Sequence, residues 1–180
     1  MSLWGASTTD DNKPKYLSDA EKRDVYATKE GWVKRTTGTG GRAGRVHEEI
    51  LVAIGELSET FAEANISNVT LVTDSISAGT DTEVNIIVTF NESVTVTGTP
   101  HVELTNVTAP IRSANIVYAS GTKSNRLTFT STVTSGTLNE NDVVGVALMR
   151  FDGGTIVDTI GGANASIAFD PIAKQITVGA

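Results

Sequence analysis

The two histidines are the first residues to weigh for chemistry, because imidazole is the side chain most often used for proton transfer near neutral pH. His47 and His101 lie far apart in the sequence, and neither has a partner at a metal-ligand spacing. No serine stands in a G-x-S-x-G elbow, and the glycine-rich run TTGTGGRAGR (36–45) lacks the Lys-Ser/Thr ending of a phosphate-binding loop. We therefore predict surface or loop histidines, a glycine-rich linker and no catalytic centre.

Acidic and asparagine side chains near predicted turns offer two other kinds of site. Asp152, Asp158 and Asp170 could ligate calcium, as acidic loops of β-sandwich proteins do, but their spacing matches no defined calcium loop. We favour solvated turn residues, and we expect no metal and no cofactor. Asn-x-Ser/Thr triplets, which could accept glycans, begin at Asn65, Asn68, Asn91, Asn106 and Asn164. In a chain rich in Thr and Asn, chance explains these triplets better than glycosylation.

Composition narrows the classes of protein further. The 180 residues carry a formal net charge of −7, which disfavours nucleic-acid binding, because phosphate neutralisation needs clustered Lys and Arg. The chain has no cysteine, so thiolate chemistry and disulfides are excluded. No stretch approaches the roughly 18 consecutive apolar residues of a membrane span. The N-terminal residues do not show the basic and apolar regions of a signal peptide, so we expect assembly in the cytoplasm.

The second half of the sequence reads as a series of strands. EVNIIVTF (83–90) and NRLTFTSTV (125–133) alternate apolar and polar residues, which predicts strands with one buried face. The residues expected on that face are Val84, Ile86, Val88, Phe90, Leu127 and Phe129. Further strands are predicted at 69–73, 100–104, 113–119, 142–148 and 174–178. Short alternating strands separated by Gly, Asn, Asp and Pro indicate an antiparallel β-sandwich over 67–180.

Residues 1–66 show a different pattern. SDAEKRDVY (18–26) predicts a short helix, because Ser18 and Glu21 have the spacing of a capping box. EGWVKR (30–35) predicts a short strand or a turn. The apolar spacing in 47–64 permits a helix of about three turns, interrupted by Gly55, and the alternative is an edge strand. We expect an extended arm with one or two short helices that docks on the sandwich or on a partner.

The arm carries aromatic and apolar residues that a polar terminal segment does not need for its own fold. Those singled out as anchors are Trp4, Pro14, Tyr16, Leu17 and Trp32. One interpretation is that they pack against this chain's own sandwich. The other is that they bind grooves of a neighbouring subunit, where aromatic side chains dominate interface energetics.

Two resemblances follow from motifs in the sequence. VTVTGTP, YASG and GTIVD occur in order within 67–178, and this part resembles a bacterial immunoglobulin-like repeat of large surface proteins. The opening LWGASTTDDNKPKYL, with ATKEGWV and EEILVAI after it, resembles virion structural proteins of large marine tailed bacteriophages. The first resemblance implies an Ig-like sandwich, and the second implies a structural role in a virion.

Together these patterns predict a non-enzymatic phage virion protein. Residues 1–66 would attach it and residues 67–180 would form an Ig-like domain displayed on the outer surface, most simply as a capsid decoration protein. The expected partners are the major capsid protein or other virion structural proteins, copies of the chain itself, and a host surface glycan, with no nucleic acid and no membrane. The alternatives are a neck, tail or fibre attachment protein of the same virion, or a bacterial surface adhesin or carbohydrate-binding Ig-like module.

Overall fold

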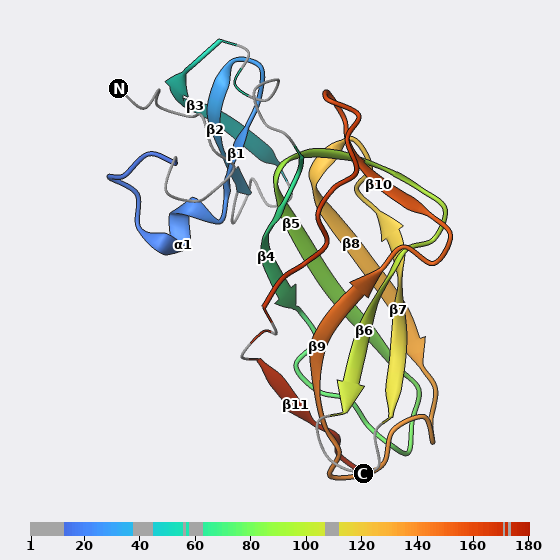
Figure 1. Ribbon diagram of the computed structural model, residues 1–180. Coiled ribbons are helices and arrows are strands. Elements are labelled where there is room, and N and C mark those ends of the chain that lie inside the picture. Colours follow the sequence, from blue (N-terminus) through green and yellow to red (C-terminus); the bar gives the residue numbers. More distant parts are fainter. Residues whose placement is uncertain are drawn as a thin grey trace.

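The chain folds into a β-sandwich with a smaller N-terminal sheet attached to one end (Figure 1). This computed structural model describes residues 13–37, 45–55, 57, 63–106, 112–170, 172 and 174–180. The elements in chain order are α1 (Asp19–Lys22), β1 (Val25–Ala27), β2 (Gly31–Thr37), β3 (Val46–Ala53), β4 (Ile66–Leu71), β5 (Thr82–Thr97), β6 (His101–Asn106), β7 (Ser113–Ser120), β8 (Ser124–Val133), β9 (Val143–Arg150), β10 (Thr155–Asp158) and β11 (Gln175–Thr177). The prediction of a mainly β fold with a sandwich in the second half is confirmed.

The sandwich consists of two layers joined at β7. One layer contains β4, β5 and β8, with β10 paired to the second half of the long strand β5. The other layer has the order β11-β9-β6-β7, and in Figure 1 β6, β7 and β9 lie over β5 and β8. β7 also pairs with β8 through Tyr118 and Ser120, which links the layers. The predicted strands coincide with β4 to β9 and β11, and the GTIVD motif contributes β10.

The sandwich core contains the alternating residues that the sequence singled out. Val84, Ile86, Val88, Phe90, Leu127 and Phe129 are all fully buried. Ile86 is opposite Phe129 in the β5–β8 ladder, and the ring of Tyr118 meets the Phe129 ring edge-on at 5.9 Å. Ala64 is also part of this core, and β4 begins at Ile66, so the sandwich takes in residues just before the predicted boundary at 67.

The described N-terminal residues form a three-stranded antiparallel meander, β1-β2-β3, and this corrects the expected extended arm. The prediction of a helix over 47–64 is wrong for the first part of that range, because Val46–Ala53 is strand β3. The alternative, an edge strand, is the one the structure shows there. Over so short a stretch the apolar residues fit both the helical period of about 3.6 and the strand period of two. Pairing with β2 selects the strand. The other expected helix is one turn, α1, with the predicted capping box between Ser18 and Glu21.

Gly31 allows the start of β2 to approach β3 closely. Its φ of 136° is rare for residues with a side chain, and a Cβ here would overlap the carbonyl oxygen of Val52. The close approach of β2 to β3 therefore depends on the glycine of the GWV motif. Among the described residues, the backbone pairing between the meander and the sandwich is one parallel contact, Ala27 of β1 with Glu92 of β5, so the sheet that runs through both is mixed rather than purely antiparallel.

Candidate interaction surface

The predicted anchor residues divide into buried and exposed ones. Trp32 and Leu17 are 1% and 8% exposed, and they pack in a small apolar cluster with Val25, Ala27 and Leu57. Both are thus core side chains of the meander, within this chain but not against the sandwich, and neither is an exposed anchor. Pro14 is buried as well. Tyr16, at 70% exposure, remains accessible, and Trp4 lies outside the described residues.

Helix α1 is fixed to the meander by a charged contact. The carboxylate of Glu21 accepts from the backbone N–H of Ser18 at 3.0 Å and from Lys34 Nζ on β2 at 2.9 Å. These bonds to Lys34, and then to Ser18, favour the ionised form and lower the pKa of Glu21 to about 2. The segment that carries Tyr16 is therefore placed by α1 and by Leu17 in the cluster.

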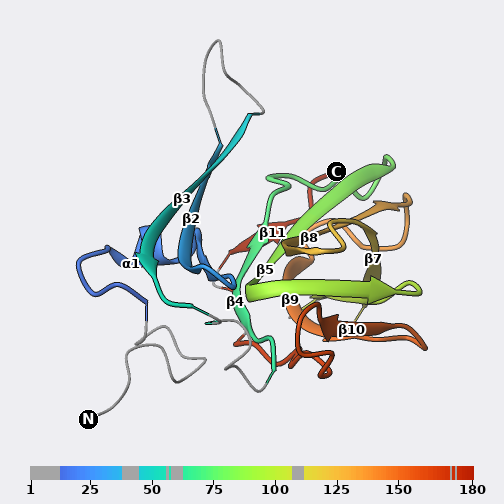
Figure 2. The same cartoon turned by 90° about the horizontal axis from the view of Figure 1, so that it is seen from above.

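Strand β3 forms the outer edge of the meander. It is last in the strand order, and in the described part of the chain only β2 pairs with it. Figure 2 shows β2 and β3 extending away from the sandwich. Val46 and Ile50 are 59% and 55% exposed. Because alternate residues of a strand share a face, both lie on the same face as Glu48. We call Val46–Ala53 with these exposed side chains the β3 edge.

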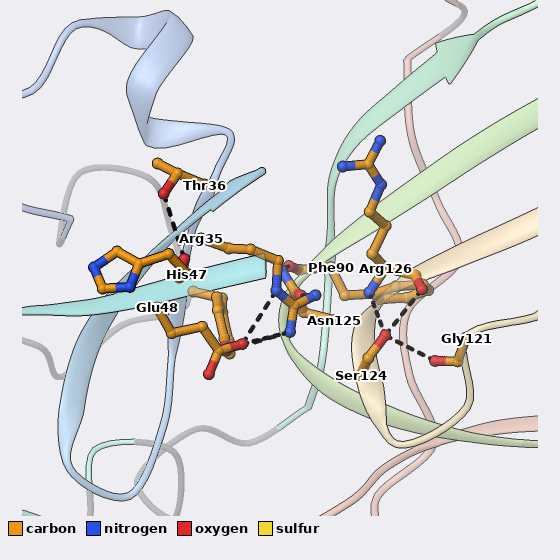
Figure 3. Close-up of polar contacts among 10 residues, drawn as sticks. Arg35, Thr36, His47, Glu48, Phe90, Gly121, Ser124, Asn125 and Arg126 are labelled. Atoms are coloured by element: carbon orange, nitrogen blue, oxygen red, sulfur yellow. Dashed lines mark hydrogen bonds and ion pairs between the residues drawn. The ribbon is translucent and has the colours of Figure 1, made fainter. Parts of the chain in front are cut away.

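An arginine connects the face of the β3 edge to the sandwich. Arg35 on β2 donates to Glu48 Oε1 at 2.8 Å and to Asn125 Oδ1 on β8 at 2.8 Å (Figure 3). Its guanidinium also lies over the Tyr26 ring, 5.1 Å from the centroid. Asn125 is buried, and its amide donates to the carbonyl oxygen of Phe90 at 3.5 Å. This network fixes how the meander sits on the sandwich.

The same network shifts two pKa values. Tyr26 donates its hydroxyl to Glu48 at 2.7 Å, and that bond, followed by the one from Arg35, lowers the pKa of Glu48. Burial, together with the bond to Glu48, raises the pKa of Tyr26 to about 12. Near neutral pH, Glu48 is consequently a carboxylate and Tyr26 a neutral phenol. The carboxylate can therefore accept from both the Tyr26 hydroxyl and the Arg35 guanidinium.

Two carboxyl groups lie inside the sandwich where the meander joins it. Glu92 and Asp158 are each 1% exposed. Asp158 accepts from the backbone N–H groups of Ile160 and Gly161 at 2.8 and 2.9 Å, so it shapes the turn after β10. Neither oxygen of Glu92 has a hydrogen-bond partner in the described structure. Both carboxyl groups are therefore shielded from solvent in the described structure.

No family model, no curated protein and no solved structure matches this chain. The function must therefore be argued from the residues and their geometry.

The two histidines lie in different surroundings in the structure. His101 Nδ1 lies 3.7 Å from Asp152 Oδ2, beyond hydrogen-bond distance. His101 is buried on β6, not in a loop or on the surface as predicted, while His47 is exposed on β3. Among the described residues no three His, Asp or Glu side chains gather as metal ligands.

The structure also shows the burial of the acidic and asparagine side chains considered as calcium or glycan sites. Asp152 is exposed in a turn, whereas Asp158 is buried and not solvated as expected. Of the asparagines in glycosylation triplets, Asn91 and Asn106 are buried, which makes those two inaccessible to a glycan. Within the described ranges no helix has the length and apolar character needed to cross a membrane.

Sequence reasoning gives the edge strand only as the alternative to a helix, and it misses the exposed side chains of β3 and the two buried carboxyls. Val46 and Ile50 fall on one face of a strand with period two, but Glu48 lies between them on that face, so the local pattern is a weak signal for an exposed apolar row. Glu92 gave no such signal, because its burial results from the packing of the meander and β10 against β5, which are distant in sequence.

Proposed function

We propose that this chain is a non-enzymatic structural protein of a bacteriophage virion, attached through its N-terminal part and displaying the β-sandwich on the outer surface. The observation that carries the proposal is the β3 edge, a projecting strand with exposed Val46 and Ile50 on a sheet that has its own small core. The partner proposed is the major capsid protein or another virion structural protein. The resemblance of the opening motifs to phage virion proteins supports the same role.

The distribution of exposed apolar residues favours attachment through the N-terminal part. Tyr16, Val46 and Ile50 have the largest exposed fractions among the large hydrophobic residues described. An edge strand also presents unpaired N–H and C=O groups, to which an extended segment of another chain can pair. Many weak contacts of this kind, repeated on a symmetric particle, give strong overall binding through avidity.

A carbohydrate-binding role is less well supported. Such a module needs exposed aromatic rings on its surface, but Phe90 and Phe129 are fully buried. Tyr118, Phe151 and Phe169 are only partly buried but pack against the same core. Among the described residues, Tyr16 is the aromatic side chain with a largely exposed ring, and it lies outside the sandwich.

The first experiment asks whether the chain is part of a particle. Virions purified from a lysate by density gradient are digested and analysed by quantitative mass spectrometry. We expect peptides of this chain at a fixed ratio to the major capsid protein, and cryo-electron microscopy should locate it on the outer surface. Absence from purified virions, with the chain present in the lysate, would contradict the proposal.

The second experiment tests the β3 edge. Purified chain is added at equal concentration to particles that lack it, and occupancy is measured. Ile50→Lys and Val46→Lys should each lower the apparent affinity by about tenfold, since each puts a charge in place of an apolar contact. Val72→Lys is the matched control, because Val72 is 45% exposed but lies on the sandwich. Equal occupancy for all variants would exclude the β3 edge as the attachment surface.

The third experiment tests the expected role of Trp4. Deletion of 1–12 is preferable to a longer truncation, because Leu17 is part of the meander cluster. If Trp4 binds a neighbouring subunit, the deletion and Trp4→Ala should both reduce occupancy on particles and leave the melting temperature of the isolated protein unchanged. Full occupancy of both variants would show that Trp4 does not take part in attachment.

A further inference from the structure

Glu92 occupies an unusual position for a carboxyl group. It lies on β5 within the irregular stretch between Thr89 and Val94, where the pairing with β8 shifts, and it is opposite Ala27 of β1. Its side chain is 1% exposed, and both oxygens lack a hydrogen-bond partner among the described residues. A buried carboxylate without donors is very unfavourable, whereas the protonated acid is neutral and is tolerated far better.

The groups around Glu92 do not stabilise its negative charge. From β10, Asp158 contributes a like charge, and its own oxygens are engaged by the N–H groups of the following turn. From β1 the facing residue is Ala27, which does not titrate. Arg35 of β2, the cation that links the meander to the sandwich, is engaged with Glu48 and Asn125. Burial is the larger effect and Asp158 the smaller, and together they raise the pKa of Glu92 to about 8.

We propose that Glu92 is a proton-controlled latch that holds the N-terminal meander on the sandwich. The protonated carboxyl stays buried beneath the β1–β5 contact and the meander is seated. Burial penalises the carboxylate in the closed form, and opening of the parallel contact between Ala27 and Glu92 relieves that penalty by exposing the carboxylate to water. Loss of the proton therefore loosens the meander while the sandwich core stays folded.

The direction of the pH effect follows from proton linkage. In the open form the carboxyl is solvated and has its ordinary pKa of about 4.5, so opening releases a proton at pH values between about 4.5 and 8. In this range the opening equilibrium constant rises by up to tenfold per pH unit, and above about 8 it levels off. The meander is thus most firmly seated in acid and loosest in mild alkali.

Amide hydrogen exchange on the full chain tests the latch. Protection of Val25–Ala27 is measured from pH 5 to pH 9 and corrected for the intrinsic pH dependence of exchange. The wild type should lose protection by up to tenfold per pH unit below pH 8, whereas Glu92→Gln, which is neutral at every pH, should show none of this dependence. Glu83→Gln is the matched control, because Glu83 is exposed on the same strand, and it should behave as the wild type.

Three results would overturn the proposal. One is an unchanged pH dependence in Glu92→Gln, and another is a wild type whose corrected protection is flat from pH 5 to pH 9. The third is restoration of protection at pH 9 by millimolar calcium in the wild type alone, which would make the pair a cation site. If Glu92→Gln does not fold, carbon-13 NMR of the wild-type Glu92 carboxyl decides instead. A midpoint near 8 supports the latch, and a midpoint near the ordinary value contradicts it.

Discussion

The sandwich and the N-terminal meander are both small antiparallel β structures, but they are stabilised differently. The sandwich buries a continuous apolar core drawn from both layers. The meander buries one small cluster around Trp32 and depends in addition on charged contacts, Arg35 with Glu48 and Lys34 with Glu21. A unit with so little buried apolar area is marginal alone, so its attachment to the sandwich is part of its stability. The difference suggests a rigid module joined to a unit that can respond to partners and to pH.

The largest effect is expected from a truncation in the sandwich core. Phe129→Ala should lower the free energy of unfolding by about 3–5 kcal/mol, because it leaves a cavity beside Tyr118 and Ile86. Urea unfolding followed by circular dichroism measures this loss. A loss below about 1 kcal/mol would mean that the sandwich is not the dominant source of stability.

A truncation in the meander cluster should act locally. Trp32→Ala removes the largest side chain of that cluster, and a loss of about 3 kcal/mol is expected to open the meander before the sandwich unfolds. Amide protection should disappear over Gly31–Thr37 and remain in β5 and β8. Loss of protection in all three strands at once would show that the two regions unfold as one unit.

The two regions also differ in how far the sequence predicts them. The alternation of apolar and polar residues in 83–90 and 125–133 places residues such as Phe90 and Phe129 correctly in the core, because a period of two fits a strand and not a helix. In the N-terminal half the stretch around Ile50 and Leu51 fits a helix or a strand, and only pairing with β2 selects the strand. The burial of Glu92 depends on contacts between distant segments, which no local pattern contains.

A smaller effect is expected at the connection between the regions. Arg35→Ala removes the bond to the buried Asn125 and the pair with Glu48, and should cost about 1.5–3 kcal/mol, the range for a hydrogen bond to a charged group. Arg126→Ala is the matched control, because Arg126 is an exposed neighbour of Asn125, and it should stay within about 0.5 kcal/mol of the wild type. Equal losses for both variants would leave Arg35 with no specific part in joining the regions.

The smallest effect concerns the charged contact that fixes α1. The pKa of Glu21 is lowered to about 2, first by the hydrogen bond from Lys34 and then by the bonds from Ser18. A lowered pKa means that the folded state favours the carboxylate, so its contribution to stability is present above the ordinary value of about 4.5 and is lost as the pH falls towards 2. Because Glu21 is on the surface, this contribution is reduced by solvent and salt.

Carbon-13 NMR of the Glu21 carboxyl measures this midpoint directly. Lys34→Gln should move the midpoint upward, towards the ordinary value, because it removes the largest cause of the shift. Lys22→Gln is the matched control, since Lys22 pairs with Asp19 on the same helix and leaves the contact between Lys34 and Glu21 intact. If Glu21 titrates near 4.5 in the wild type, α1 is not held to β2 by this contact, and the meander then depends on its apolar cluster and on Arg35 alone.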